Sequence, residues 1–175
     1  METFSHNNEQ PYESLFTPEQ SRDRESVLAD VHKDGFALKD FPELQNDIEI
    51  VLAAVRQDAF AIVHASPELQ ENRDVILAAI NQEGMVLKVL SKDVRADVEL
   101  VLAAVENEPF AIAYVAPELL ADETFVLSAL ALSPLAIVYA EQSLKKNIDF
   151  LTRAVLVNKD ILNHFSKNVQ QQLEG

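Results

Sequence analysis

The 175-residue sequence contains no cysteine, and this absence excludes several kinds of site. A disulfide framework, a thiolate nucleophile and a cysteine-ligated zinc site are all ruled out. The fold therefore does not depend on an oxidising compartment, and we expect a cytoplasmic protein. Only three glycines are present, Gly35, Gly84 and Gly175, so a glycine-rich phosphate-binding loop is excluded as well.

Basic residues are also scarce. The sequence has 14 Lys and Arg against 29 Asp and Glu, which gives a formal net charge of −15. Affinity for nucleic acid depends on Lys and Arg side chains that neutralise phosphates, so we expect no nucleic-acid partner. An anionic membrane surface is disfavoured for the same reason.

Long apolar runs are missing too. The longest, residues 125–140, has about sixteen residues and is interrupted by Ser133 and Pro134, whereas about twenty are needed to cross a bilayer. The N-terminus has no basic start followed by an apolar run. The sequence therefore predicts neither a membrane-spanning helix nor a cleaved export signal.

Recognisable catalytic motifs are absent. The chain has no GxSxG, HExxH or EF-hand pattern, and its four histidines are dispersed at His6, His32, His64 and His164. We therefore expect no catalytic residue, no cofactor and no metal site, and we interpret the protein as non-enzymatic.

What the sequence does contain is a repeat of 25 residues. An apolar block, VLAA in its first clear copy, begins at Val51, Ile76, Val101 and Val126. A second apolar column keeps the same spacing, at Leu44, Leu69, Val94, Leu119, Leu144 and Val169. Two columns in register predict tandem structural units.

Each unit has the pattern of a helical hairpin. An Asp or Asn lies four residues before each apolar block and predicts a helix N-cap, at Asp23, Asp47, Asn72, Asp97, Asp122 and Asn147. In the second unit the helix opened by Asp47 is followed by a shorter helix, FAIVHA, and by a single helical turn, SPELQ. Gly35 and Gly84 fall in the hairpin turn, where we expect a positive φ.

Two helices this short cannot bury their apolar sides alone, so neighbouring units must stack. The sequence predicts an all-α fold, a right- or left-handed α-solenoid of about six 25-residue helical-hairpin repeats. We expect a flexible N-terminal tail over residues 1–20 and a single helical-repeat domain over 21–175. Leucines of the apolar block are expected to fill the space between units: Leu52, Leu77, Leu102 and Leu127.

The pattern D-x-x-x-V-L-A-A-V, followed by F-A-I and S-P-E-L, resembles a bacterial family of short tandem repeats of unknown function. Some members of that family occur in effector-like proteins of intracellular pathogens. The resemblance implies the same repeat fold and leaves open a role inside a host cell after translocation. It transfers no catalytic residue to this chain.

The first candidate binding region is acidic. Between Arg95 and Lys145 there are eight Asp and Glu and no Lys or Arg, and the candidates we single out are Glu106, Glu108, Glu118 and Glu123. Such a region could steer a basic protein partner into contact, or it could serve only solubility.

The second candidate is a stripe on the second helix of each unit. One column there reads His64, Val89, Tyr114, Tyr139 and His164, and its last three members are the candidate binding residues. Tyrosine with histidine is typical of interfaces, although a half-buried tyrosine with a structural role fits the same pattern.

The third candidate is apolar. At the end of the first helix most units are polar, but the last two carry Ala131 with Leu132 and Leu156 with Val157. These four predict a partner or homodimer interface, unless residues 169–173 fold back over them.

Together these features predict a protein-binding scaffold, regulatory or effector-like, with a protein partner. The alternative is an acidic inhibitor that mimics a polyanion and blocks a basic site on a target protein.

Overall fold

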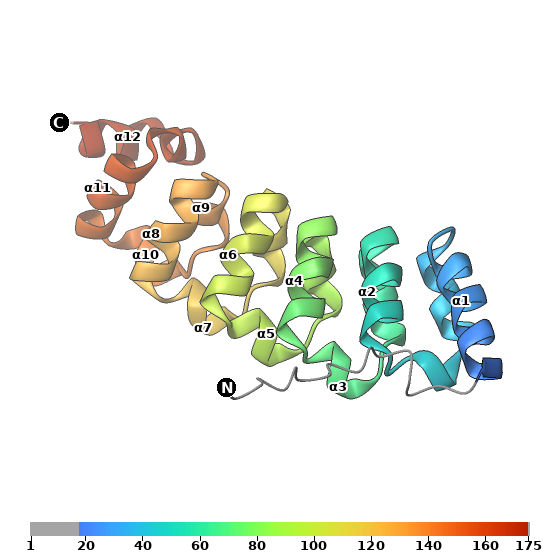
Figure 1. Cartoon of the computed structure of the whole chain (residues 1–175). Helices are drawn as coiled ribbons and strands as arrows, with labels where there is room; N and C mark the ends of the chain where they lie inside the picture. Colours follow the sequence, from blue (N-terminus) through green and yellow to red (C-terminus); the bar gives the residue numbers. More distant parts are fainter. Residues whose placement is uncertain (1–17, 175) are drawn as a thin grey trace, which may run out of the picture.

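The computed structural model describes residues 18–174, and no β-strand occurs among these described residues. Figure 1 shows the longer helices side by side in chain order, from α1 to α11, in an elongated and curved array. The predicted all-α repeat fold is therefore confirmed. Of the predicted tail, residues 1–17 lie outside the described residues, and the first helix already begins at Pro18.

Each of six consecutive units has a first helix, a second helix and a third helix. The first helices are α1 (Pro18–Val31), α2 (Ile48–Gln57), α4 (Arg73–Gln82), α6 (Val98–Asn107), α8 (Glu123–Leu132) and α11 (Ile148–Val157). The second helices are η2 (Gly35–Asp40), η4 (Ala59–His64), η5 (Gly84–Val89), η6 (Pro109–Tyr114), α9 (Ala136–Tyr139) and η7 (Lys159–His164). The third helices are η3 (Pro42–Leu44), α3 (Pro67–Gln70), α5 (Lys92–Ala96), α7 (Pro117–Leu120), α10 (Gln142–Lys146) and α12 (Lys167–Glu174).

Most of the second helices, written η, are 3₁₀ helices rather than the α-helices that the hairpin pattern suggests. With three residues per turn, positions three apart in such a helix point to the same side. The third helices α3, α5, α7 and α10 lie along one edge of the array, and the hairpin turns between first and second helices lie along the opposite edge (Figure 1).

The first helices of units two to six begin at side chains that pair with free backbone N–H groups. The capping side chains accept hydrogen bonds from the first turn as predicted, at Asp47, Asn72, Asp97, Asp122 and Asn147. The prediction for Asp23 is wrong, because α1 starts at Pro18 and Asp23 lies inside it. Proline is compatible with the first helical position, where the backbone N–H has no partner within the helix.

The core is continuous from unit to unit. Its members from the first helices occupy three positions of the apolar block, for example Val51, Ala54 and Val55, which are completely buried. These positions lie three and four residues apart and so share one side of the helix. The leucine at the remaining position is only half-buried: Leu52 and Leu77 line an open groove between α2 and α4 instead of filling the core.

Gly35 and Gly84 begin the second helices η2 and η5. No glycine among the described residues has a positive φ, so the predicted reason for these glycines is wrong. The structure shows a different one: a Cβ at Gly84 would overlap the carbonyl oxygen of Ala104 in the next unit, and one at Gly35 would overlap that of Ala54. Glycine is required here because two backbones approach closely.

We predict that Gly84→Ala destabilises the protein by about 1 to 3 kcal/mol, because the added methyl group forces η5 away from α6. Urea denaturation monitored by circular dichroism measures the change. Lys159→Ala is the matched control, since Lys159 occupies the same position in the last unit and is exposed. Equal denaturation midpoints for wild type and Gly84→Ala would contradict the close-approach explanation.

Candidate binding surfaces

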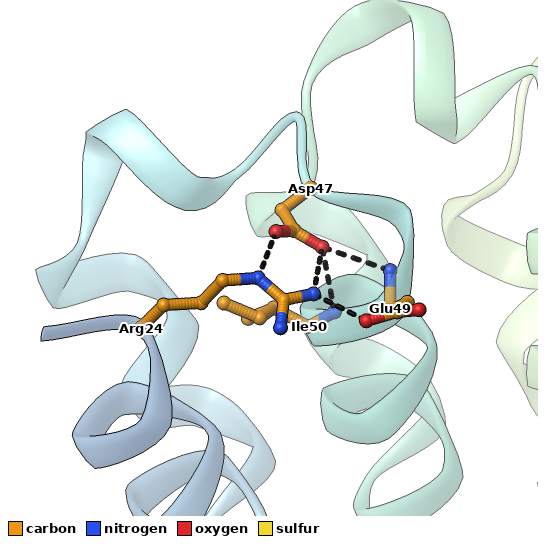
Figure 2. Close-up of polar contacts among 4 residues, drawn as sticks. All are labelled: Arg24, Asp47, Glu49 and Ile50. Atoms are coloured by element: carbon orange, nitrogen blue, oxygen red, sulfur yellow. Dashed lines mark hydrogen bonds and ion pairs between the residues drawn. The ribbon is translucent and has the colours of Figure 1, made fainter. Parts of the chain in front are cut away.

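Charged side chains link the first helices of units one and two. Arg24 in α1 donates hydrogen bonds to both carboxylate oxygens of Asp47, at 2.6 Å from Nε and 3.1 Å from Nη2, and also contacts the Glu49 carboxylate (Figure 2). Asp47 also accepts hydrogen bonds from the backbone N–H groups of Glu49 and Ile50. One carboxylate therefore caps its own helix and joins it to the preceding unit.

The same contact recurs between units three and four. Arg73 in α4 donates a hydrogen bond to Asp97 at 3.0 Å and contacts Glu99, so the arrangement of N-cap and arginine is repeated. From the sequence, Asp47 and Asp97 were predicted only as helix N-caps. Their second role, as partners of arginines in the preceding unit, was missed.

Between the last two units the ion pair is reversed: the carboxylate lies in the earlier unit and the arginine in the later one. Glu123 occupies the position in its unit that Arg24 and Arg73 occupy in units one and three, and it pairs with Arg153 of α11. The N-cap of α11 is the neutral Asn147. The position of the aspartate caps Asp47 and Asp97 is thus neutral in α11, and the carboxylate of this link comes from α8 instead.

The hydrogen bonds of the two aspartate caps alter their pKa values. Burial raises the pKa of Asp47, but hydrogen bonds from Arg24 and from the backbone N–H of Ile50 outweigh burial, so the pKa lies below its ordinary value. Burial likewise raises the pKa of Asp97, and hydrogen bonds from Leu100 N–H and Arg73 again leave it lowered. A carboxylate whose pKa is lowered by folding stabilises the protein above its unfolded-state pKa and loses this contribution as the pH falls through the folded-state pKa.

The apolar residues predicted at the C-terminal end lie together and are exposed. Ala131 and Leu132 end α8, Leu156 and Val157 end α11, and these two helices pack side by side. We call these four residues the tip patch, because they lie at the hairpin turns. Leu156 is 82% exposed. The predicted covering segment does not shield it, since Leu173 of α12 packs against the core.

The tyrosine and histidine stripe is present but uneven. Tyr114, Tyr139 and His164 end the second helices of three consecutive units, η6, α9 and η7, which contact one another in that order. Tyr114 is half-buried and packs against the core, whereas Tyr139 and His164 are exposed. Tyr114 thus fits the structural interpretation, and the other two remain candidates for binding.

The four acidic candidates do not form one surface. Glu106 and Glu108 lie at the hairpin turn of unit four, whereas Glu118 lies in α7 on the opposite edge. Glu118 pairs with Lys92 at 3.1 Å, and Glu123 pairs with Arg153. The acidic stretch is therefore partly neutralised by basic residues from outside it.

The described residues offer little for catalysis or cofactor binding. No group of three His, Asp or Glu in residues 18–174 is placed to hold a metal ion. The groove between α2 and α4 has a volume of about 550 Å³, and its charged residues are Arg56 and Asp74. Within the same part of the chain, no helix has the length and apolar character needed to span a membrane.

The 25-residue units are grouped in pairs. Two features recur at a spacing of 49 residues, the arginine that pairs with the next unit's N-cap and the glycine at the hairpin turn: Arg24 with Arg73 and Gly35 with Gly84. The intervening units carry other residues at these positions, namely Ile48 with Val98 and Ala59 with Pro109. This 49-residue signal is present in the sequence and was missed beside the stronger 25-residue spacing.

A continuous stack of paired helical units defines the chain as a helical-repeat protein. A family model for a domain of unknown function (DUF4116) matches residues 23–70, 72–120 and 122–170, and the chain belongs to this family. Each match spans one pair of units, so the family's repeat is the pair that the glycines and arginines mark. No curated protein and no solved structure matches the chain.

We predict that Asp47→Asn keeps the N-cap but loses the ionic contact with Arg24, which lowers the free energy of unfolding at pH 7 by about 1 to 3 kcal/mol. The difference from wild type should begin to shrink below about pH 4, where the carboxylate of the unfolded wild type takes up a proton, and should vanish once the folded carboxylate, whose pKa is lower, is protonated too. Chemical denaturation from pH 2 to pH 8 measures both values.

Two variants serve as controls for this prediction. Asp122→Asn changes a cap for which no salt bridge is found among the described residues and should have a smaller effect. Asp97→Asn, whose pair with Arg73 is more exposed, should cost less than about 1 kcal/mol. A pH-independent difference for Asp47→Asn would contradict the ionic role of Asp47.

Proposed function

We propose that the protein is a non-enzymatic protein-binding scaffold, regulatory or effector-like, whose partner docks on the tip patch. The observation that supports this best is the exposure of Leu156 beside Leu132 and Val157. Contiguous apolar surface on a monomer is unfavourable in water and commonly marks an interaction site. A cytoplasmic location, in the producing cell or after translocation into a host, is part of the same proposal.

The repeat itself does not require apolar residues at the tip. The positions equivalent to Leu156 in units two, three and four are Arg56, Asn81 and Glu106, and all three are exposed. The same backbone thus tolerates polar side chains there, and the fold does not require apolar ones at these positions. This contrast supports a partner as the reason for them.

The alternative, an acidic inhibitor that mimics a polyanion, has less support. A polyanion mimic needs several unpaired carboxylates on one surface to face a basic site. Here Glu118 and Glu123 already have basic partners, and Glu106 and Glu108 lie at the other edge from Glu118.

We predict that Leu156→Asp abolishes capture of the partner, because a charge placed in an apolar contact must be desolvated without a partner of its own. Immobilised wild type and variant are exposed to lysate of the source cells, and captured proteins are quantified by mass spectrometry. At least one protein should be enriched by wild type and lost about tenfold or more with Leu156→Asp.

Asn81→Asp is the matched control, since it adds the same charge at the equivalent position of a polar tip. Both substitutions are on exposed side chains and should leave stability within about 0.5 kcal/mol of wild type. Molar mass from light scattering shows whether the partner is a second copy, which would give a dimer that Leu156→Asp splits. Identical capture and identical molar mass for all three proteins would argue against the proposed function.

A further inference from the structure

The second helices of the four middle units have an unusual composition for this chain. They comprise residues 59–64, 84–89, 109–114 and 134–139, and they contain not one Asp or Glu in a protein with 29 of them. Their single Lys or Arg is Lys88. These helices therefore form a band that is nearly free of charge in an otherwise acidic molecule.

The apolar side chains of this band reach the surface. Of the large apolar residues that are exposed within residues 24–173, where burial is described, half belong to it: Val63, Val89, Phe110, Val138 and Tyr139. Phe110 is 56% exposed, and it stands at the same position of its unit as Phe60. Positions three apart share a side of a 3₁₀ helix, so the columns of Phe60 and Val63 face the same way in η4, η5 and η6. The five exposed residues come from these two columns, at Phe110, Val63 and Val138, and from the adjacent column of His64 and Tyr114, at Val89 and Tyr139. We call these exposed residues the second-helix face.

Contacts between units show that the face is continuous at its N-terminal end. Lys88 of unit three lies over the ring of Phe60 in unit two, with 4.5 Å from Nζ to the ring centroid. One unit earlier, the rings of Phe36 and His64 meet edge to face, with centroids 5.6 Å apart. The second helices of units two to five contact their neighbours in turn.

Packing of the fold does not explain the apolar character of this face. The two end units bury the same inner positions, Leu38 in unit one and Ile161 with Leu162 in unit six. Their outer positions are nevertheless mostly charged or polar, at Lys39, Asp40, Asp160, Asn163 and His164. The face is therefore limited to four units and is bounded by charge at both ends.

Carboxylates also border the face along its two long edges. At the hairpin turns, Glu83 and Glu108 precede η5 and η6, and neither side chain caps its helix, unlike Asp58 before η4. At the other edge, the exposed Glu68 and Asp93 begin α3 and α5. An apolar strip between two acidic borders is complementary to a segment with an apolar side flanked by Lys or Arg.

The size of the face selects the shape of its occupant. Neighbouring helices pack about 9 Å apart, so four units span roughly 27 Å. An α-helix of about 18 residues has this length. We propose that the second-helix face binds a basic amphipathic helix of another protein, laid across the second helices of units two to five. This inference rests on the proposed protein-binding function and adds a second surface to it.

The test uses the full-length chain and an 18-residue amphipathic peptide of leucine and lysine, labelled for fluorescence anisotropy. Two control peptides keep one property each: one replaces the lysines with glutamates, the other replaces the leucines with glutamines. The leucine and lysine peptide should bind saturably, and the affinity of each control peptide should be at least about tenfold lower. If the peptide in which glutamines replace the leucines binds as tightly as the leucine and lysine peptide, charge alone is responsible for binding and the proposal is overturned.

Variants locate the binding. Val89→Asp and Val138→Asp should each lower the affinity for the leucine and lysine peptide about tenfold. Ser128→Asp, on an exposed position of α8, should leave this affinity unchanged. The double variant Glu83→Lys with Glu108→Lys should lower the affinity for this peptide. The control double variant Glu25→Lys with Glu43→Lys, which changes the net charge equally but lies in unit one, should lower it less. Unchanged affinity with Val138→Asp would overturn the proposal.

Two further outcomes separate this inference from the proposed function. If no peptide binds while capture from lysate still depends on Leu156, the second-helix face is not a binding site but the scaffold function stands. If neither peptide binding nor capture from lysate depends on the named residues, both the second-helix face and the proposed scaffold function are refuted. A wild-type dimer in light scattering that Val138→Asp splits would make a second copy the occupant and overturn the choice of a basic helix.

Discussion

The structure depends on apolar contact between units that are each too short to fold alone. A first helix such as α4 buries Ile76, Ala79 and Ile80 completely or almost so, and it does so against α2 on one side and α6 on the other. Since every unit supplies half of two interfaces, stability accumulates along the array and is not held in any one unit. The buried positions that face a neighbour must therefore stay apolar and fitted in size. Exposed positions that neither cap a helix nor pair with a charge are less constrained and are the places where a binding surface can be built.

Pairing of the units follows from the contacts that supplement this core. The close approach at Gly35 and Gly84 and the arginine pairs of Arg24 and Arg73 all connect an odd unit to the even unit after it. In unit five the glycine position is occupied by Pro134, and the second helix is the α-helix α9. Proline fixes φ and cannot donate a backbone hydrogen bond, so this pair of units is joined differently. The exchanged pair of Glu123 and Arg153 shows that the ionic link itself is retained.

The sequence predicts the fold well because local sequence patterns determine where each helix begins and how the units repeat. N-caps such as Asp97 and the 25-residue apolar columns depend on short-range rules of helix formation, and the structure confirms them. Features that need two units to be placed against each other were predicted poorly. The reason for Gly84 is a carbonyl oxygen of the next unit, and the partner of Arg24 is a helix cap 23 residues further on. Neither contact is visible in the pattern of a single unit.

The candidate surfaces were also predicted unevenly, because some are visible in the repeat pattern and others depend on which side chains the packing buries. Leu156 could be recognised because it breaks a polar column within the repeat, which needs only the register. The second-helix face was recognised only in part, through the column of Val89 and Tyr139, because its other apolar columns look like core in every middle unit. Only burial separates the inner Ile112, which is completely covered, from the outer Phe110, which is not. In a 3₁₀ helix the inner and outer positions follow a period of three, which short apolar segments do not reveal.

The acidic charge and the apolar surfaces impose a joint constraint on association. Two copies of a chain with a net charge of −15 repel each other at low ionic strength, which opposes contact between their apolar faces. A basic partner experiences the opposite force and is drawn toward the same surface. The charge therefore disfavours contact between copies through exposed apolar residues such as Phe110 and Leu156. Salt screens charges that lie farther away than about 8 Å at physiological ionic strength, so charges that border the apolar residues closely, as Glu108 borders Phe110, contribute most to this effect.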